Sequence, residues 1–328
     1  MSEYQYYEFQ AIDRPLTATE LATVRRSSTR ARISPTQFVN DYAWGDFGAD
    51  EDAWMERYFD AFLYYANWGT RVVQFRLPAT QLSVGEARRY CAGDSAAVRK
   101  KGAFVIVTFR SERDDGDEWY EAEDVPSTLA ALIPARAELA HGDRRALYLG
   151  WLARAQNELD DEVREPPVPP GLATLSAALE VLATYLRIGP DLLAAAAAPI
   201  PGAGTARTVG ALMTEADAHR MRREAVEARR EAAATARRAR TAAAARAKHL
   251  DSLVGREAAL WDEVERLVET KLAKGYDAAL PLLLDLRDLM ARGQGDDYAR
   301  RLDALRERHA TKRSFLARLV EEGLMPGR

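Results

Sequence analysis

The chain has 328 residues, of which 47% are hydrophobic and 29% charged, and its formal net charge is −4. This length predicts two or three structural units with buried cores, and the charge excludes a uniformly basic protein, so any contact with nucleic acid must be local. One cysteine, Cys91, and four scattered histidines exclude a disulfide framework and the usual zinc cages.

Residues 1–125 alternate strand-like and helix-like patterns, which predicts an aromatic-rich α+β domain with a small mixed sheet and packed helices. Thr17 and Glu20 have the spacing of a capping box for a short helix. Four stretches read as strands: 4–11, 36–42, 72–77 and 103–110.

Residues 41–68 hold ten aromatic side chains. Trp54, Tyr58, Phe62 and Tyr65 follow helical spacing, so we expect a helix whose aromatic face packs on the sheet as core. The alternative is a stacking platform for bases. For that role Trp44, Phe47 and Trp68 are the better candidates, because platforms usually sit on strands or loops.

The stretch 25–36 combines arginines with small hydroxyl side chains, which suits a phosphate or a carboxylate. The alternative is an ordinary surface turn. If this domain has a ligand pocket, we expect these residues to form it: Arg30, Arg32, Trp44, Asp46 and Trp68.

Beyond residue 125 the pattern is mostly helical. We expect a helical domain at 126–198, a Pro/Gly linker at 199–211, a long Ala/Arg-rich helix at 212–274 and a C-terminal helical hairpin at 275–328. An unbroken helix over 212–274 would span roughly 90 Å. Gly255 is a tolerable weak point within it.

The second half of that helix has a continuous apolar seam that must pack on something. The final helical pair can fold back on the seam, or the seam can bind a partner. We take these residues as the candidate partner seam: Leu253, Leu260, Trp261, Val264 and Leu267.

Residues 220–249 contain ten Arg or Lys against three Glu. Such a helix can follow a phosphate backbone. Two alternatives are a solvated spacer and a surface that the acidic stretches 112–124 and 158–165 occupy. The candidate contact residues are Arg222, Arg223, Arg229, Arg230, Arg237, Arg238, Arg240, Arg246 and Lys248.

Signatures of catalysis are thin. The chain lacks the common nucleophile-elbow, phosphate-loop and zinc-protease motifs, and no histidine precedes His141 to activate Cys91. The stretch 202–207 (GAGTAR) follows a Pro-rich break and has no lysine, so we read it as linker. We expect no catalytic residues, no metal and no cofactor.

The stretches YQYYEFQAIDRPL, RARISPTQFVNDYAWGDF and YFDAFLYYANWGT resemble a family of bacterial proteins from high-GC genomes whose function is unassigned, over most of the chain. The C-terminal stretch from YDAALPLLLDLRDLMA onward is similar to tails of some bacterial SWIM zinc-finger proteins. The Cys/His set of that finger is lacking here, so zinc is not carried over. The resemblance implies only an intracellular protein.

We therefore expect an α+β N-terminal domain followed by a mostly α-helical half containing a long helix. The favoured function is a non-enzymatic binding or scaffold protein whose long helix serves self-association, as a homo-oligomer, or contact with another protein. The alternative is a nucleic-acid-binding accessory factor that uses the basic helix, and an enzyme of unrecognised type comes third. No apolar run long enough for a membrane span and no secretory pattern occur, so we expect a cytoplasmic location without membrane contact.

Overall fold

The computed structural model describes residues 4–43, 47–112, 125–199, 206–293 and 297–325. The chain forms two compact units, Met1–Ala225 and Val226–Arg328. The α+β class is confirmed, because an antiparallel sheet is followed by helices, among them the 45-residue α8 (Val209–Leu253).

The sheet of the first unit has seven described strands in the order β2-β3-β1-β4-β5-β7-β6, and all its pairs are antiparallel. The four expected strands correspond to β1, β3, β5 and β7, and three further strands were not predicted. The bounds are β1 Gln5–Gln10, β2 Arg32–Ile33, β3 Gln37–Tyr42, β4 Ala61–Ala66, β5 Thr70–Pro78, β6 Ala96–Lys101 and β7 Phe104–Glu112.

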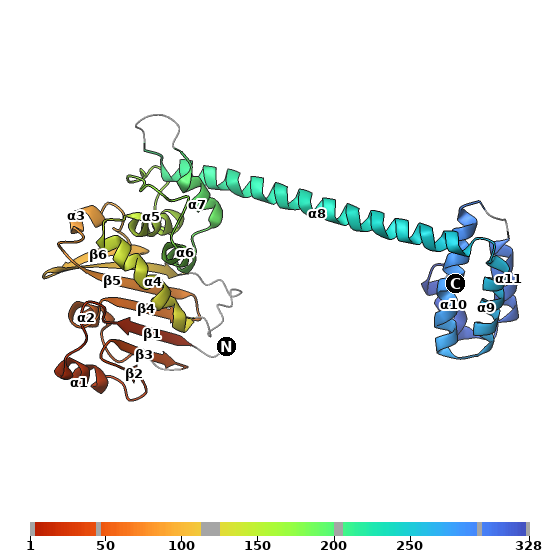
Figure 1. The fold of residues 1–328 in the computed structure, drawn as a ribbon, viewed down its shortest axis with the longest axis horizontal. Helices are drawn as coiled ribbons and strands as arrows, with labels where there is room; N and C mark the ends of the chain where they lie inside the picture. Colours follow the sequence, from red (N-terminus) through yellow and green to blue (C-terminus); the bar gives the residue numbers. More distant parts are fainter. Residues whose placement is uncertain (1–3, 44–46, 113–124, 200–205, 294–296, 326–328) are drawn as a thin grey trace. The chain divides into compact units, whose positions relative to one another are not determined.

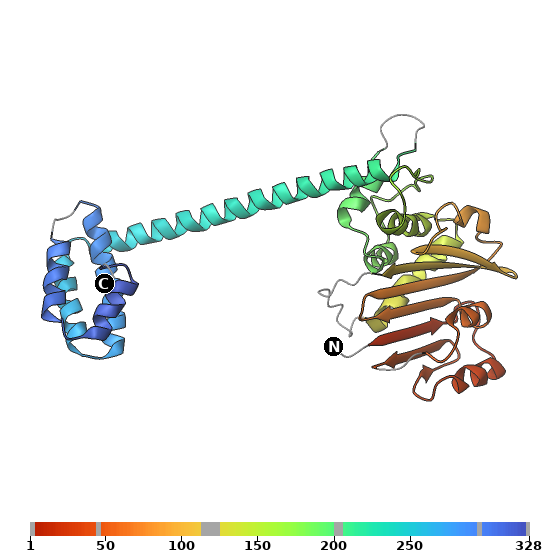
Figure 2. The same ribbon diagram turned by 180° about the vertical axis from the view of Figure 1, so that it is seen from behind.

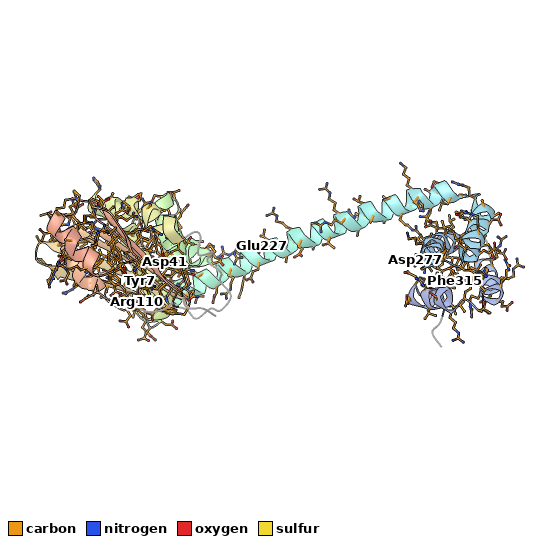
Figure 3. The ribbon with its side chains drawn as sticks, turned by 90° about the horizontal axis from the view of Figure 1, so that it is seen from below. Tyr7, Asp41, Arg110, Glu227, Asp277 and Phe315 are labelled. Atoms are coloured by element: carbon orange, nitrogen blue, oxygen red, sulfur yellow. The ribbon has the colours of Figure 1, made fainter. Side chains whose placement is uncertain are left out.

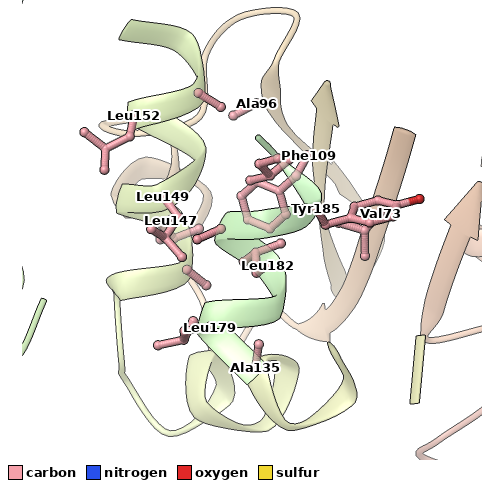
Figure 4. Close-up of a cluster of buried hydrophobic side chains, with 14 of the residues drawn as sticks. Val73, Ala96, Phe109, Ala135, Leu147, Leu149, Leu152, Leu179, Leu182 and Tyr185 are labelled. Atoms are coloured by element: carbon pink, nitrogen blue, oxygen red, sulfur yellow. The ribbon is translucent and has the colours of Figure 1, made fainter. Parts of the chain in front are cut away.

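Three helices cover one face of the sheet: α4 (Val125–Ala140), α5 (Arg145–Asn157) and α6 (Ala177–Tyr185). Helix α4 crosses in front of the strands in Figure 1 and behind them in Figure 2. Phe109 of β7 packs in one buried cluster with Leu147 and Leu182 (Figure 4). The expected separate helical domain at 126–198 is therefore wrong, because these helices complete the core of the sheet.

The opposite face carries an aromatic core around Phe9, which stacks on Phe62 with ring centroids 4.3 Å apart. Helix α2 (Glu51–Arg57) adds Trp54, which meets Phe38 edge-on at 4.9 Å. The expectation of core is confirmed for this cluster. The expected helix ends early, however, and Phe62 lies on β4, a central strand that is buried on both faces and so shows no clear strand period.

A buried carboxylate fixes the start of β4. Asp60, 1% exposed, accepts the backbone N–H groups of Ile12 at 2.7 Å and Asp13 at 2.9 Å. It also accepts Arg76 Nη2 at 2.7 Å. The charge is thus compensated where the chain leaves α2 and enters the sheet.

The remaining short helices of this unit are α1 (Ala18–Arg26), α3 (Val84–Ala87) and α7 (Pro190–Ala197). The predicted linker at 199–211 is shorter than expected. Within its described part, Thr208 forms an isolated antiparallel β-bridge with Arg164, and α8 already begins at Val209. Residues 200–205, which include most of GAGTAR, lie outside the described residues.

In the second unit, the end of α8 packs with four shorter helices. These are α9 (Glu257–Glu269), α10 (Ala273–Ala291), α11 (Tyr298–Arg308) and α12 (Arg313–Glu321). The predicted single helix over 212–274 is wrong. Gly255 adopts φ +78° and Lys271 φ +57°, and these left-handed residues end one helix and redirect the next.

Candidate nucleic-acid interface on helix α8

The middle of α8 is fully open to solvent. Every residue from Arg220 to Ala245 is exposed. Its side chains alternate between short alanines and long charged groups that point away from the helix (Figure 3). Alanine is the best helix former, so this stretch keeps its helix without help from a core.

Six basic residues share one side of this helix. At about 100° per residue they fall within a sector of roughly 100°, and from first to last they span about 39 Å. We call this set the basic face: Arg222, Arg229, Arg230, Arg237, Arg240 and Lys248. Within the described part of the chain, none of the six forms an ion pair. The face therefore offers cations that no carboxylate of the described chain neutralises.

The three glutamates of the stretch, Glu224, Glu227 and Glu231, lie outside that sector by helical spacing. Arg238 lies among them and is not part of the face. This separation of basic and acidic side chains could have been predicted from the sequence, because a helical projection of residues 220–249 places the basic face and the three glutamates on different sides. Counting charges over the whole stretch misses it.

Two other predicted contact residues are held by carboxylates. Arg223 Nη2 lies 2.7 Å from Asp191 Oδ2 at the start of α7. Arg246 Nη2 lies 2.6 Å from Asp288 Oδ2 on α10, and Arg246 also pairs with Asp285. His249 Nε2 lies 2.7 Å from the second oxygen of Asp285. These contacts tie each end of α8 to helices of its own unit, so we remove Arg223 and Arg246 from the candidate surface.

The predicted partner seam is core. Val264 is completely buried, Leu260 and Trp261 are each 9% exposed, and Leu253 and Leu267 pack in the same cluster. The cluster includes side chains of α10, α11 and α12. A seam already filled by its own unit is no docking surface for another chain.

The candidate ligand pocket is not formed by its described members. Arg32 lies on β2 at the sheet edge, and Trp68, 43% exposed, lies in the turn after β4. These positions are three strands apart, on the order of 14 Å at the usual strand spacing. Arg30 is exposed in the loop before β2, and Trp44 and Asp46 lie outside the described residues.

Two hollows occur elsewhere on the first unit. One, of about 560 Å³, lies over β5, β6 and β7 beside α2. Its arginines are matched by its own carboxylates, Arg99 with Asp52 at 2.9 Å and Arg110 with Glu112 at 2.8 Å. The other, of about 490 Å³, lies between Tyr90 and the Pro-rich segment 167–171. Neither brings together a nucleophile and a base.

Cys91 is fully buried, and burial raises the pKa of its thiol to about 12. At neutral pH the group is therefore the thiol and not the nucleophilic thiolate. Its sulfur lies 3.9 Å from the carbonyl oxygen of Leu147, inside the core. This is the environment of a small apolar residue.

The acidic stretches do not cover the basic face in the described chain. Residues 113–124 lie outside the described residues. In the second stretch, Glu158 accepts the backbone N–H of Asp94 at 3.1 Å, and Glu165 pairs with Arg207. Both carboxylates are thus used within the first unit and not on α8.

Comparisons with protein-family profiles, curated proteins and solved structures find no match. The resemblance seen in the sequence stays a prediction. The described helices include none with the length and apolar character to span a bilayer. No group of three or more His, Cys, Asp or Glu side chains in the described ranges is placed to hold a metal ion.

Proposed function

We propose that this chain is a non-enzymatic cytoplasmic protein that binds nucleic acid through the phosphate backbone, using the basic face of α8. The observation that carries the proposal is the set of six solvent-exposed cations on one side of a helix, none of which has an ionic partner in the described residues. The seam that favoured self-association in the sequence is buried, which shifts the balance toward the basic face.

Phosphate contact is the chemistry that such a face fits. Duplex DNA carries one negative charge per about 1.7 Å of its axis, and each neutralised phosphate releases condensed counterions. Arginine forms paired hydrogen bonds to phosphate oxygens. Between its arginines the exposed stretch has mainly alanine and three glutamates, with few groups that read base edges, so we expect binding without sequence preference.

The test is fluorescence anisotropy of the full chain with a labelled mixed-sequence DNA duplex at several salt concentrations. Six phosphate contacts predict a slope of log K against log salt of about −5. The triple variant Arg230→Gln, Arg237→Gln and Arg240→Gln should weaken binding and reduce the slope by about 3. Its fold should be unchanged, because all three side chains are exposed.

A matched control removes three arginines that are ion-paired on the second unit: Arg266→Gln, Arg300→Gln and Arg306→Gln. It changes the net charge equally but leaves the basic face intact, so the slope should stay the same. Absence of binding at low salt would refute the proposal. Equal losses in both triple variants would also refute it, since the effect would then be one of overall charge.

A scaffold role through self-association is the second candidate. It loses the seam at residues 253–267 but retains α8 itself, whose exposed stretch carries a second, independent pattern of charges.

A further inference from the structure

We propose that the exposed stretch of α8 pairs with α8 of a second copy of the chain, parallel and in register. The pairing does not rest on nucleic-acid binding. It rests on two features of this stretch. A line of small side chains is left exposed by the described chain, and charges of opposite sign lie on the two sides of that line.

The line follows steps of four and three residues along the helix, the repeat that faces a partner helix in a left-handed coiled coil. Its first member, Met221, is 65% exposed. We call this line the alanine seam: Met221, Ala225, Ala228, Ala232, Thr235, Ala239 and Ala242. Small side chains let two helices approach closely but contribute little apolar area, so the seam alone specifies no partner.

The charges beside the seam specify the partner and its direction. One flank carries Arg222 and Arg229, and the other carries Asp217, Glu224 and Glu231, followed by Arg238. In a parallel coiled coil, an acidic-flank residue of one helix lies opposite a residue of the arginine flank of the other helix. The residue in the other helix is five positions later in the sequence. Asp217 then meets Arg222 of the second copy, and Glu224 meets Arg229.

Two-fold symmetry repeats both contacts, giving two attractive pairs on each side of the coil. Antiparallel pairing over the full seam would instead place like flanks together, with Arg222 and Arg229 facing Ala243 and Ala236, so neither arginine would meet a carboxylate. Glu224 and Arg229 form no ion pair within the described chain. Asp217 pairs with Arg220 at 2.8 Å, but both side chains are more than half exposed, so that contact exchanges easily. Opposite charge thus selects a second copy in parallel over the reverse arrangement.

The pairing keeps four of the six cations of each basic face outside the contact between the helices. Arg230, Arg237 and Arg240 lie away from the alanine seam, so they stay exposed in the pair. Two helices then present two lines of arginines. Arg222 and Arg229 leave the face to pair across the seam.

The test is sedimentation equilibrium of the full chain without nucleic acid over a range of concentrations. We expect the mass to rise from 36.5 kDa toward twice that value. Glu224→Arg and Arg229→Glu should each weaken association by about tenfold, because each turns attractive contacts into repulsive ones. The double variant should restore it. Arg230→Glu, the same charge change one residue further on and away from the seam, should leave it unchanged.

Direction is tested by disulfide formation at the seam. Ala225→Cys and Ala239→Cys, made one at a time, should both give covalent dimers, because in-register parallel helices place each residue opposite itself. An antiparallel pair brings at most one of these positions together. A strict monomer at all concentrations, a double variant that does not restore association, or crosslinking at only one position would each overturn the proposal. A monomer that still binds DNA would leave the proposed function standing.

Discussion

Arg207 and Glu165 form a two-pronged ion pair inside the first unit. Arg207 Nε donates to Glu165 Oε2 at 2.8 Å, and Nη2 donates to Oε1 at 2.9 Å. The two residues are 7% and 4% exposed. Tyr148 donates its hydroxyl to the same carboxylate, and Arg207 Nη1 donates to Glu215 at 2.8 Å. The pair joins the Pro-rich segment after Glu165 to the start of α8.

Glu165→Gln should destabilise the first unit by about 3–5 kcal/mol, because it leaves a buried guanidinium with incomplete compensation. Urea unfolding followed by circular dichroism measures this loss. Glu112→Gln is the control. It removes an exposed ion pair with Arg110 in the same unit and should cost less than about 1 kcal/mol. Equal costs would mean that the burial of the Glu165 pair has no energetic consequence.

Gly150 lies where α5 crosses the sheet. A Cβ atom there would stand 2.6 Å from Cε1 of Phe109 and 3.0 Å from Cβ of Ala96. Phe109 is completely buried and has no room to move. Gly150→Ala should therefore cost about 1–3 kcal/mol despite the better helix propensity of alanine.

The control is Gly85→Ala in α3, where nothing lies within 4 Å of the added atom. That substitution should stabilise by roughly 0.5–1 kcal/mol. Thermal or urea unfolding of the two variants should give opposite signs. The close approach of α5 to β7 would be disproved by a stabilised Gly150→Ala chain.

The sequence correctly predicted elements whose signals lie within a few neighbouring residues. The capping box at Thr17 and Glu20 begins α1, as expected. Strand β4 could not be predicted this way. It is buried between β1 and β5 and apolar on both faces, so its aromatic residues also fit the helical spacing that starts at Trp54. Only long-range pairing decides between the two.

The break in the long helix illustrates the same limit. A glycine in an Ala-rich helix costs about 1 kcal/mol, which a helix of this length tolerates. At Gly255 the chain instead takes the left-handed conformation, because α9 gains by packing Val264 against α10. The apolar pattern of the candidate partner seam could be seen in the sequence. The sequence did not reveal that α10, α11 and α12 of the same chain cover it. The basic residues of α8 could also be predicted from the sequence. The ion pairs that hold Arg223 and Arg246 could not, because they depend on the tertiary fold.

Val264 should be essential to the second unit. Val264→Asp places an unpaired charge in the core between helices and should cost several kcal/mol, enough to unfold that unit. Val226→Asp makes the same chemical change at a position that is 54% exposed and should alter stability by less than about 0.5 kcal/mol. Differential scanning calorimetry distinguishes them. If Val264→Asp reduced self-association while the second unit stayed folded, the candidate partner seam at residues 253–267 would be an interface between chains.

The capping box of α1 predicts a response to acid. Arg14 Nη2 lies 2.7 Å from Glu20 Oε1, and Thr17 donates its backbone N–H to Glu20 Oε2 at 2.8 Å. The hydrogen bonds from Arg14, and then those from Thr17, lower the pKa of Glu20 from its ordinary 4.5 to about 2. Because the folded state holds the ionised form more tightly, this contribution to stability is complete above about pH 4.5 and is lost as the pH falls toward 2.

Glu20→Gln removes the charge at every pH. The difference in unfolding free energy between the parent chain and this variant should therefore be constant from neutral pH to about pH 5 and should then shrink as the pH falls toward 2. Urea midpoints measured at intervals of pH give this difference directly. A difference that persists undiminished at the acid end would mean that the Glu20 carboxylate is not stabilised by Arg14 and Thr17, and the capping box would then act through its backbone geometry alone.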